Sequence, residues 1–134
     1  MFMDIYYKHV STELWTQGCL TKIDSKTDDD GKIIEVNGLL NGNEFLIKTN
    51  KLSESLPACI MTFAYWDPNM LKEKKLLNPQ NAEWLDIETT LIKQELLSVK
   101  GQNIITNHYV LKGTKEGHER LVIDLWYDEE MNWV

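Results

Sequence analysis

The chain has 134 residues, 43% of them hydrophobic, and a formal net charge of −7 at pH 7. This length fits one domain that buries a sizeable core without disulfides or metal ions as staples. The acidic balance disfavours phosphate attraction, so we expect no nucleic-acid partner. No apolar run approaches the roughly 20 residues of a membrane-spanning helix, so we expect no transmembrane segment, and the first residues lack the features of a signal peptide.

The apolar pattern has a period closer to two than to 3.6 residues, which indicates antiparallel β structure. The first strand is predicted from Met3 to Gln17, with a bulge near its middle where the apolar residues change parity. A second strand follows over residues 19–27. The pairs Asp30-Gly31 and Asn41-Gly42 predict tight turns on either side of a third strand, so the hairpins form a meander. The acidic run before Gly31 lacks the spaced ligands and helices of a calcium loop and is interpreted as a solvated turn.

The middle of the chain combines a strand with the only predicted helix. Phe45–Asn50 is predicted to pair back, and the apolar run from Ala58 to Trp66 is predicted to be buried. Asp67-Pro68 suits a helix N-terminus, with the carboxylate as N-cap and proline in the first turn. We therefore expect a short helix near residues 68–75, ended before Asn78-Pro79.

The C-terminal third fits strands, although the spacing of its apolar residues between Leu91 and Val99 would also suit a helix. Hairpin loops are predicted at 100–103 and 114–117, and a last strand over 121–127. The fold class is therefore mainly β: a curved antiparallel sheet, half-barrel or open barrel, with about eight or nine strands. Its predicted core consists of Ile5, Leu14, Trp15, Ile23, Ile34, Val36, Phe45, Ile47, Phe63, Tyr65, Leu71, Tyr109, Leu111, Ile123 and Leu125.

The two cysteines, Cys19 and Cys59, leave two states open. They could form one disulfide in an oxidising compartment, or remain two buried thiols in a reducing one. Their wide separation excludes a CxxC motif, and a zinc site would have to recruit histidines from remote segments. We therefore predict no metal and no cofactor.

Two aromatic motifs, Phe63–Pro68 and Leu125–Asp128, place large rings directly before acidic residues. Tyr and Trp suit apolar binding surfaces because their rings are apolar while their tips can hydrogen-bond. The first hypothesis is that rings on a concave sheet face hold an apolar small molecule, a lipid or a hydrophobic partner segment. The candidate ligand-binding rings are Trp15, Phe63, Tyr65, Trp66, Tyr109, Trp126 and Tyr127. The alternative for each ring is a place in the core.

A second hypothesis is a hydrolase in which a histidine acts beside a carboxylate as general base. No serine or cysteine lies in a glycine-flanked elbow, so we assign no catalytic residue and favour a non-enzymatic protein. A buried histidine bonded to a carboxylate for structural reasons is the simpler interpretation. The polar candidates are His9, Glu13, Asp67, Asn78, His108 and Asp128.

Several motifs resemble those of DUF6134, a bacterial family of exported domains of unknown function. The similar segments are Tyr7-Lys8-His9, Glu13-Leu14-Trp15, Gly18-Cys19-Leu20, Thr27–Gly31, Ala64–Pro68 with Leu77-Asn78, Tyr109–Gly113, and Leu125–Asp128. Residues 79–82 depart from the Gln-Thr-Gly that the family tends to carry there.

The resemblance implies a domain exported by Gram-negative bacteria and ordinarily preceded by a signal peptide and further N-terminal strands. We therefore expect residues 1–134 to form a single β domain, the C-terminal portion of a longer family domain. The implied location is periplasmic or otherwise extracytoplasmic, with the cytoplasm as the alternative. The resemblance supplies no activity and no catalytic residue. More loosely, the chain is similar to DUF3108 and lipoprotein-carrier sheets, which hold apolar ligands, although fold analogy is weak evidence of function.

A third hypothesis follows from the missing strands. An uncovered sheet edge pairs readily with another chain, so we expect a possible homodimer by strand addition or exchange. The segment Met1–Gln17 is the natural element to exchange.

Overall fold

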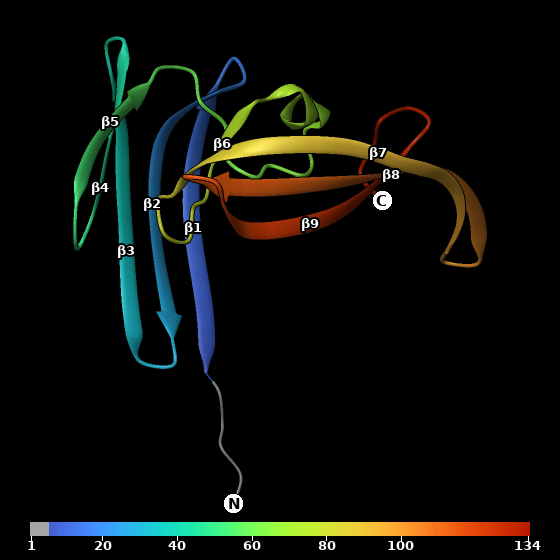
Figure 1. Ribbon diagram of the computed structural model, residues 1–134, viewed down its shortest axis with the longest axis horizontal. Coiled ribbons are helices and arrows are strands. Elements are labelled where there is room, and N and C mark those ends of the chain that lie inside the picture. The colour runs from blue at the N-terminus through green and yellow to red at the C-terminus, as the bar shows by residue number, and fades with distance from the viewer. Residues whose placement is uncertain (1–5) are drawn as a thin grey trace, which may run out of the picture. The chain divides into compact units, whose positions relative to one another are not determined.

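The computed structural model describes residues 6–134, which form nine strands and one 3-10 helix arranged in two antiparallel sheets (Figure 1). The described chain divides into two compact units, residues 6–62 with 77–84 and residues 63–76 with 85–134. The mainly β, antiparallel fold is confirmed. Two sheets replace the one curved sheet that we predicted, and neither closes into a barrel over the described residues. The single domain stays a prediction.

The five-stranded sheet of the first unit is a simple meander. Its strands are β1 (Tyr7–Thr16), β2 (Cys19–Asp29), β3 (Lys32–Asn41), β4 (Glu44–Thr49) and β5 (Ser53–Pro57), paired in chain order. Asp30 and Gly31 both have positive φ, at 51° and 91°, so the predicted turn residues perform the predicted role.

The bulge expected near the middle of the first strand is wrong. The register between β1 and β2 shifts between Leu14 and Trp15, at the end of the hairpin. From Tyr7 to Leu14 the alternation is regular, but β1 is an edge strand on which both faces carry exposed apolar side chains. The change of the apolar residues from odd to even positions is therefore due to exposed apolar side chains on both faces of β1, and not to a bulge. Residues Met3 and Ile5, at the predicted start of this strand and in the predicted core, lie outside the described residues.

One face of this sheet carries the core of the first unit. Its close packing is clearest at Gly38, where an added Cβ would lie 2.5 Å from the Phe45 ring and 2.8 Å from Ile23. The segments after β5 cover the same face, and Leu20 N–H donates to the Ile60 carbonyl across the packing. The buried members are Leu20, Ile23, Val36, Phe45, Ile47, Leu56, Ile60, Leu77 and Ala82.

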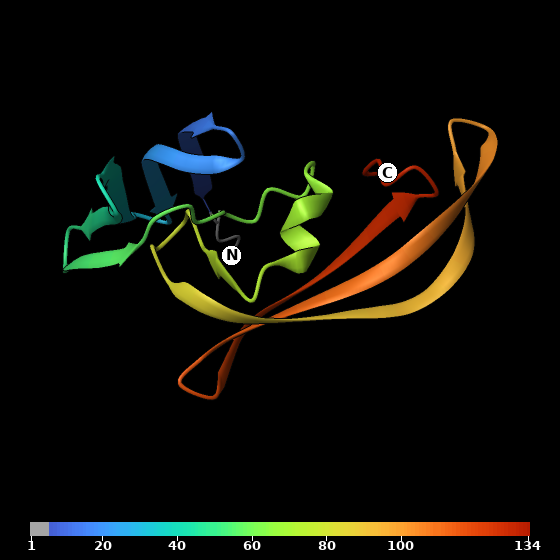
Figure 2. The same ribbon diagram turned by 90° about the horizontal axis from the view of Figure 1, so that it is seen from above.

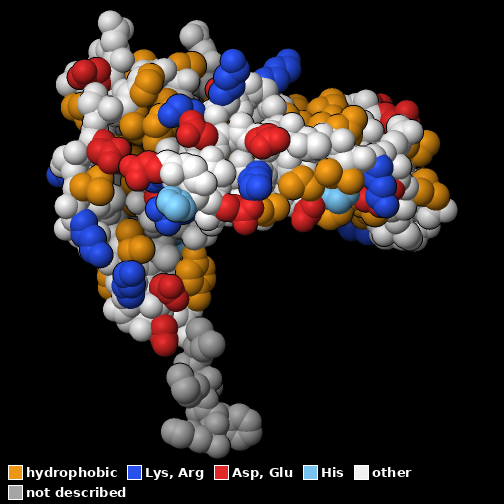
Figure 3. Space-filling view, viewed as in Figure 1, with side chains coloured by type: hydrophobic (Ala, Val, Ile, Leu, Met, Phe, Trp, Pro, Cys, Tyr) orange, Lys and Arg blue, Asp and Glu red, His pale blue; other side chains and the backbone are white. Residues whose placement is uncertain are grey.

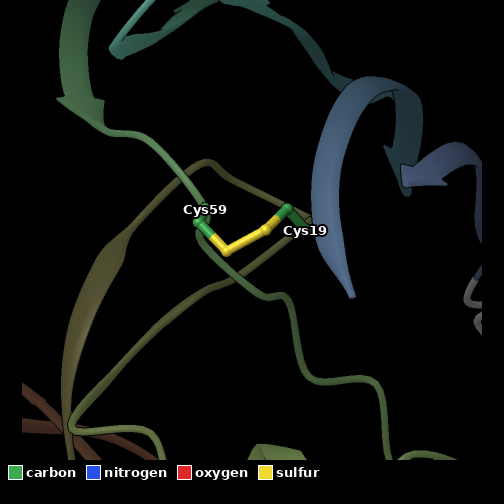
Figure 4. The surroundings of a disulfide bond; sticks show 2 residues. All are labelled: Cys19 and Cys59. Atoms are coloured by element: carbon green, nitrogen blue, oxygen red, sulfur yellow. A yellow bond between two sulfur atoms is a disulfide. The ribbon is translucent and has the colours of Figure 1, made fainter. Parts of the chain in front are cut away.

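A disulfide joins Cys19, at the start of β2, to Cys59, after the end of β5 (Figure 4). It links residues 40 positions apart within the first unit. The sequence had left the state of these cysteines open, and the structure assigns the bonded one.

The second unit contains most of a four-stranded sheet in the order β6 (Lys75–Leu77), β7 (Trp84–Val99), β8 (Gln102–Lys115) and β9 (His118–Asp128). The region that also suited a helix is strand β7, as predicted. Figure 2 shows β7 and β8 curving strongly, with the segment before β6 and the C-terminal residues on the concave side. Register shifts between Leu91 and Lys93 and between Gly113 and Thr114 accompany this curvature.

The predicted helix is present in a shorter form. It is a 3-10 helix, η1 (Pro68–Lys72), capped by Asp67, whose carboxylate accepts the Asn69 N–H at 3.0 Å. The cap and the proline act as predicted, and Met70 packs inward. The helix ends early because Lys75 already enters the sheet as the first residue of β6.

The predicted core is confirmed in its centre and wrong at its margins. Leu14 is exposed because it lies on the outer face of an edge strand, and Tyr65 is exposed because it lies in a loop. Tyr127, which we had assigned to the ligand site, is fully buried. Predicted core residues that are buried are Ile23, Val36, Phe45, Ile47, Leu111 and Leu125, and those partly buried are Trp15, Ile34, Phe63, Leu71, Tyr109 and Ile123.

Candidate functional site: an apolar patch on the second unit

The two aromatic motifs singled out in the sequence meet in the second unit. The Tyr127 hydroxyl donates a 2.6 Å hydrogen bond to the Tyr65 carbonyl. The Tyr127 ring also lies edge-on to Tyr109, with centroids 5.9 Å apart. Burial raises the pKa of Tyr127 to about 12, and the negative charge of Asp67 and the nearby Tyr109 add to the effect. Tyr127 is thus a neutral, buried support under the loop that carries Tyr65.

Three exposed rings lie above this support. Tyr65 contacts Trp66 edge-on at 5.2 Å between centroids and contacts Trp133 at 4.5 Å. The three side chains remain 41%, 55% and 50% exposed, respectively. Sequence reasoning missed Trp133, because its role depends on a bridge to Tyr127 that only the folded chain forms.

The turn after β9 holds Trp133 in place. One carboxylate oxygen of Asp128 accepts the backbone N–H groups of Glu130 and Asn132, and the other oxygen accepts from the Asn132 side chain. These bonds, led by the Asn132 backbone, lower the pKa of Asp128. Val134 N–H then donates to the Trp126 carbonyl. The carboxylate of Asp128 therefore orders the segment that carries the third ring.

Aliphatic side chains of β7 and β8 extend the aromatic surface. Leu91 lies directly opposite Tyr109, and Leu96 lies opposite Ile105. Because residues 105 and 109 are four apart on one strand, both pairs share the face to which Tyr109 belongs. These three aliphatic side chains are between 44% and 60% exposed. We define the apolar patch as Tyr65, Trp66, Leu91, Leu96, Ile105 and Trp133.

Contacts beneath the patch link its rings to the sheet. The Trp133 ring contacts the Tyr65 ring, and the Tyr65 carbonyl accepts a hydrogen bond from Tyr127. The Tyr127 ring contacts Tyr109, which lies opposite Leu91 on the neighbouring strand. The Gln94–Asn107 pair lies between Leu91–Tyr109 and Leu96–Ile105 on this face, so the apolar side chains are interrupted by a polar pair. In the view of Figure 3, hydrophobic side chains along the β7–β8 hairpin lie among acidic and basic side chains and a histidine.

The opposite face of the same sheet carries a polar cluster around His108. The imidazole stacks on Trp126, its cross-strand neighbour, with centroids 4.4 Å apart. Its Nε2 lies 2.8 Å from Asp124 Oδ1. Its buried Nδ1 lies 3.5 Å from Glu95 Oε1, within ion-pair range but without hydrogen-bond geometry.

Glu95 is held on its other side by the indole N–H of Trp126, which donates to Oε1, and by Lys93, whose Nζ is 3.4 Å from Oε2. The indole bond contributes most to lowering the pKa of this carboxyl, followed by Lys93 and His108. This arrangement surrounds His108 with two carboxylates and an aromatic ring.

The structure separates the seven candidate rings. Trp15 packs against the core of the first unit, and Trp126 lies on the polar face of the second. Phe63 is partly buried, and Tyr109 and Tyr127 form the layer under the patch. Tyr65 and Trp66 are the two candidates that the patch itself includes.

The polar candidates do not form one constellation within either unit. In the first unit, His9 Nδ1 lies 2.8 Å from the Thr27 hydroxyl, and Asn78 closes a turn by accepting the Gln80 N–H. Glu13, also on β1, lies opposite Ile23. In the second unit, Asp67 and Asp128 are caps of local turns. Among residues 6–134 no group of three or more His, Cys, Asp or Glu side chains is placed to hold a metal ion.

The first unit has a separate hollow, of about 600 Å³, on the outer face of its sheet. Leu39 and Leu46 lie directly opposite each other there and are 56% and 42% exposed. Lys22, Asn37 and Lys48 share the wall. Sequence reasoning missed it, although leucines on the solvent-facing parity of two adjacent strands are a signal that could have indicated it.

A family model described as "Domain of unknown function (DUF6134)" matches residues 1–134. No curated protein and no solved structure matches the chain significantly. Within residues 6–134, the structure contains no helix of the length and apolarity needed to cross a bilayer.

Proposed function

Because the chain belongs to DUF6134, a family described only as a domain of unknown function, we propose its role from its geometry. It is a non-enzymatic binding domain that holds an apolar molecule or a hydrophobic partner segment on the apolar patch. The observation that carries this proposal is the group of six large apolar side chains in the second unit, each at least 41% exposed. Apolar areas of this kind on soluble domains commonly mark interaction sites.

The patch is preorganised for binding. Tyr65 is held from below by Tyr127, and the Asp128 turn fixes the segment of Trp133. Rings fixed before association lose little side-chain entropy on binding, so more of the burial energy appears as affinity. Covering the remaining exposed half of each side chain is worth on the order of 1 kcal/mol.

The disulfide supports an extracytoplasmic place of action. Cys19 and Cys59 are bonded in the structure, and such bonds persist in oxidising compartments and are rare in the cytosol. A periplasmic or exported location is therefore part of the proposal. Its test is alkylation of free thiols in freshly lysed cells. If Cys19 and Cys59 were alkylated on most of the protein, they would be reduced in the cell, which would favour the cytoplasm.

The decisive experiment combines native mass spectrometry with a dye titration. The protein is purified by gentle lysis without detergent, and its mass is recorded for copurifying apolar adducts. It is then titrated with N-phenyl-1-naphthylamine, a neutral apolar dye. We expect saturable dye binding that is weakened about tenfold in Trp66→Ala and Leu96→Ser, the loss of roughly 1.4 kcal/mol.

Two matched variants serve as controls. Trp126→Ala removes a tryptophan from the opposite face of the same sheet, and Leu39→Ser removes a leucine from the hollow of the first unit. Both should leave dye affinity unchanged, provided that circular dichroism shows them folded. Binding lost only in Leu39→Ser would transfer the site to the hollow, and no saturable binding or adduct at all would overturn the apolar-ligand proposal.

A further inference from the structure

Among residues 6–134, strand β1 is a long edge of the five-stranded sheet. Over ten residues from Tyr7 to Thr16 it pairs on one side only, with β2. It contains no proline, and Tyr7, Val10 and Leu14 are at least 50% exposed. Such edges are templates for pairing with another chain unless short strands, prolines, bulges or charged side chains protect them, and β1 carries the charged residues Lys8 and Glu13.

The other three sheet edges are blunted. Strand β5 has five residues and ends at Pro57, and β6 has three residues. Strand β9 is interrupted by a register shift, and the C-terminal segment occupies the N–H of Asp128 and the carbonyl of Trp126. Among residues 6–134, β1 is therefore the one edge that has neither a short length, a proline nor a covering segment, which makes it the edge most open to a partner strand.

The His9 imidazole and the Glu13 carboxylate on β1 are hydrogen-bonding groups that are complementary to a second copy of the same strand. His9 and Glu13 lie on one face, four residues apart, and the strand rise separates them by roughly 13 Å. They therefore cannot pair within the chain. His9 Nδ1 is engaged by Thr27, which leaves Nε2 available, and Glu13 has no ion pair among residues 6–134.

We infer that two copies of this chain pair antiparallel along β1, with Ser11 of each copy at the two-fold axis. If the two-fold axis is perpendicular to the sheet, the core faces of both copies lie on the same side. Residues that pair across the axis must then both be odd-numbered or both be even-numbered. With Ser11 at the axis, His9 lies opposite Glu13 of the second copy, twice by symmetry. Tyr7 lies opposite Trp15 of the second copy, which forms aromatic cross-strand pairs as well.

The adjacent registers lose these pairs. Centring on Val10 places His9 opposite Ser11 and Tyr7 opposite Glu13. Centring on Thr12 places His9 opposite Trp15 and Ser11 opposite Glu13. The imidazole–carboxylate pairs therefore select the Ser11 register.

The test is sedimentation velocity of the full chain over a wide concentration range at neutral pH. Edge pairing alone buries a small area, so we expect a concentration-dependent dimer. His9→Glu places two carboxylates opposite each other and should weaken the dimer about tenfold, because two imidazole–carboxylate pairs become pairs of like charge. The double variant His9→Glu with Glu13→Lys should restore it, and Glu54→Lys on β5 is the matched charge control that should leave it intact.

A second measurement does not depend on these charges. Cys19 and Cys59 are bonded to each other, so a cysteine introduced by Ser11→Cys is the only free thiol among the described residues. It should form an intermolecular disulfide under mild oxidation, whereas Ser53→Cys on β5 should not. A wild-type protein that stays monomeric at every concentration, or a dimer unaffected by His9→Glu, would overturn the inference. A dimer lost in His9→Glu and not restored in the double variant would overturn the register.

Discussion

The hydroxyl of Tyr127 donates a hydrogen bond to the backbone carbonyl of Tyr65, 62 residues earlier in the chain. This one contact joins the last long strand to the loop that presents Tyr65 and Trp66. Since the carbonyl belongs to the loop rather than to the sheet, its position depends on a side chain instead of on strand pairing. The apolar patch is thus built on a buried polar contact.

Tyr127→Phe should lower the free energy of unfolding by about 1–2 kcal/mol, because the bond is lost and a partly buried carbonyl is left without its donor. Urea unfolding measures the change. The matched control is Tyr109→Phe, whose hydroxyl has no hydrogen bond among the described contacts, and which should change stability by less than about 0.5 kcal/mol. Equal effects of the two variants would contradict a special role for the Tyr127 hydroxyl.

Alkaline pH should remove the stability that Tyr127 provides. Its folded pKa of about 12 exceeds the ordinary value of 10.0, so the folded state holds the proton more tightly than the unfolded state. The contribution is fully present below about pH 10 and is lost as the pH rises toward 12, by on the order of 2 kcal/mol. Other groups titrate in this range, so the quantity to measure is the stability difference between wild type and Tyr127→Phe. A difference that stays constant from pH 9 to about 12 would argue against the raised pKa.

Replacing both Cys19 and Cys59 by serine should reduce the free energy of unfolding by about 4 kcal/mol, the loop-closure value for a 40-residue separation. Denaturant unfolding of the oxidised wild type, the reduced wild type and the double variant gives the comparison. Reduced wild type should resemble the variant. If reduction left the unfolding midpoint unchanged, the disulfide would not constrain the unfolded chain as expected.

Gly38→Ala should destabilise the first unit by about 1–3 kcal/mol through overpacking against Phe45 and Ile23. Gly113→Ala is the matched control in the second unit, where the nearest atom is a leucine methyl group at 3.1 Å that can yield. Thermal unfolding of both variants tests whether Gly38→Ala loses more stability than Gly113→Ala. A larger loss in Gly113→Ala would show that the packing around Gly38 is looser than its distances indicate.

The sequence by itself determined the features that depend on near neighbours. Alternating side chains specified the strands, and Asp30-Gly31 specified a turn because only a few residues accept positive φ. Asp67 and Pro68 similarly specified the start of η1. The alternation could not show that β1 is an edge strand, which is why Leu14 was assigned to the core and a bulge was placed in the wrong position.

Only the tertiary structure decided which distant segments meet. The Cys19–Cys59 bond, the division into two sheets and the support of Tyr65 by Tyr127 all depend on how strands pair and cover one another. The tertiary structure also decided on which face of the sheet each ring lies. Trp126 and Tyr127 are adjacent in sequence, yet Trp126 stacks on His108 in a polar cluster and Tyr127 is buried beneath the patch. Local chemistry fixes where a strand alternates, whereas burial of one face against the rest of the chain decides which side chains become core, support or surface.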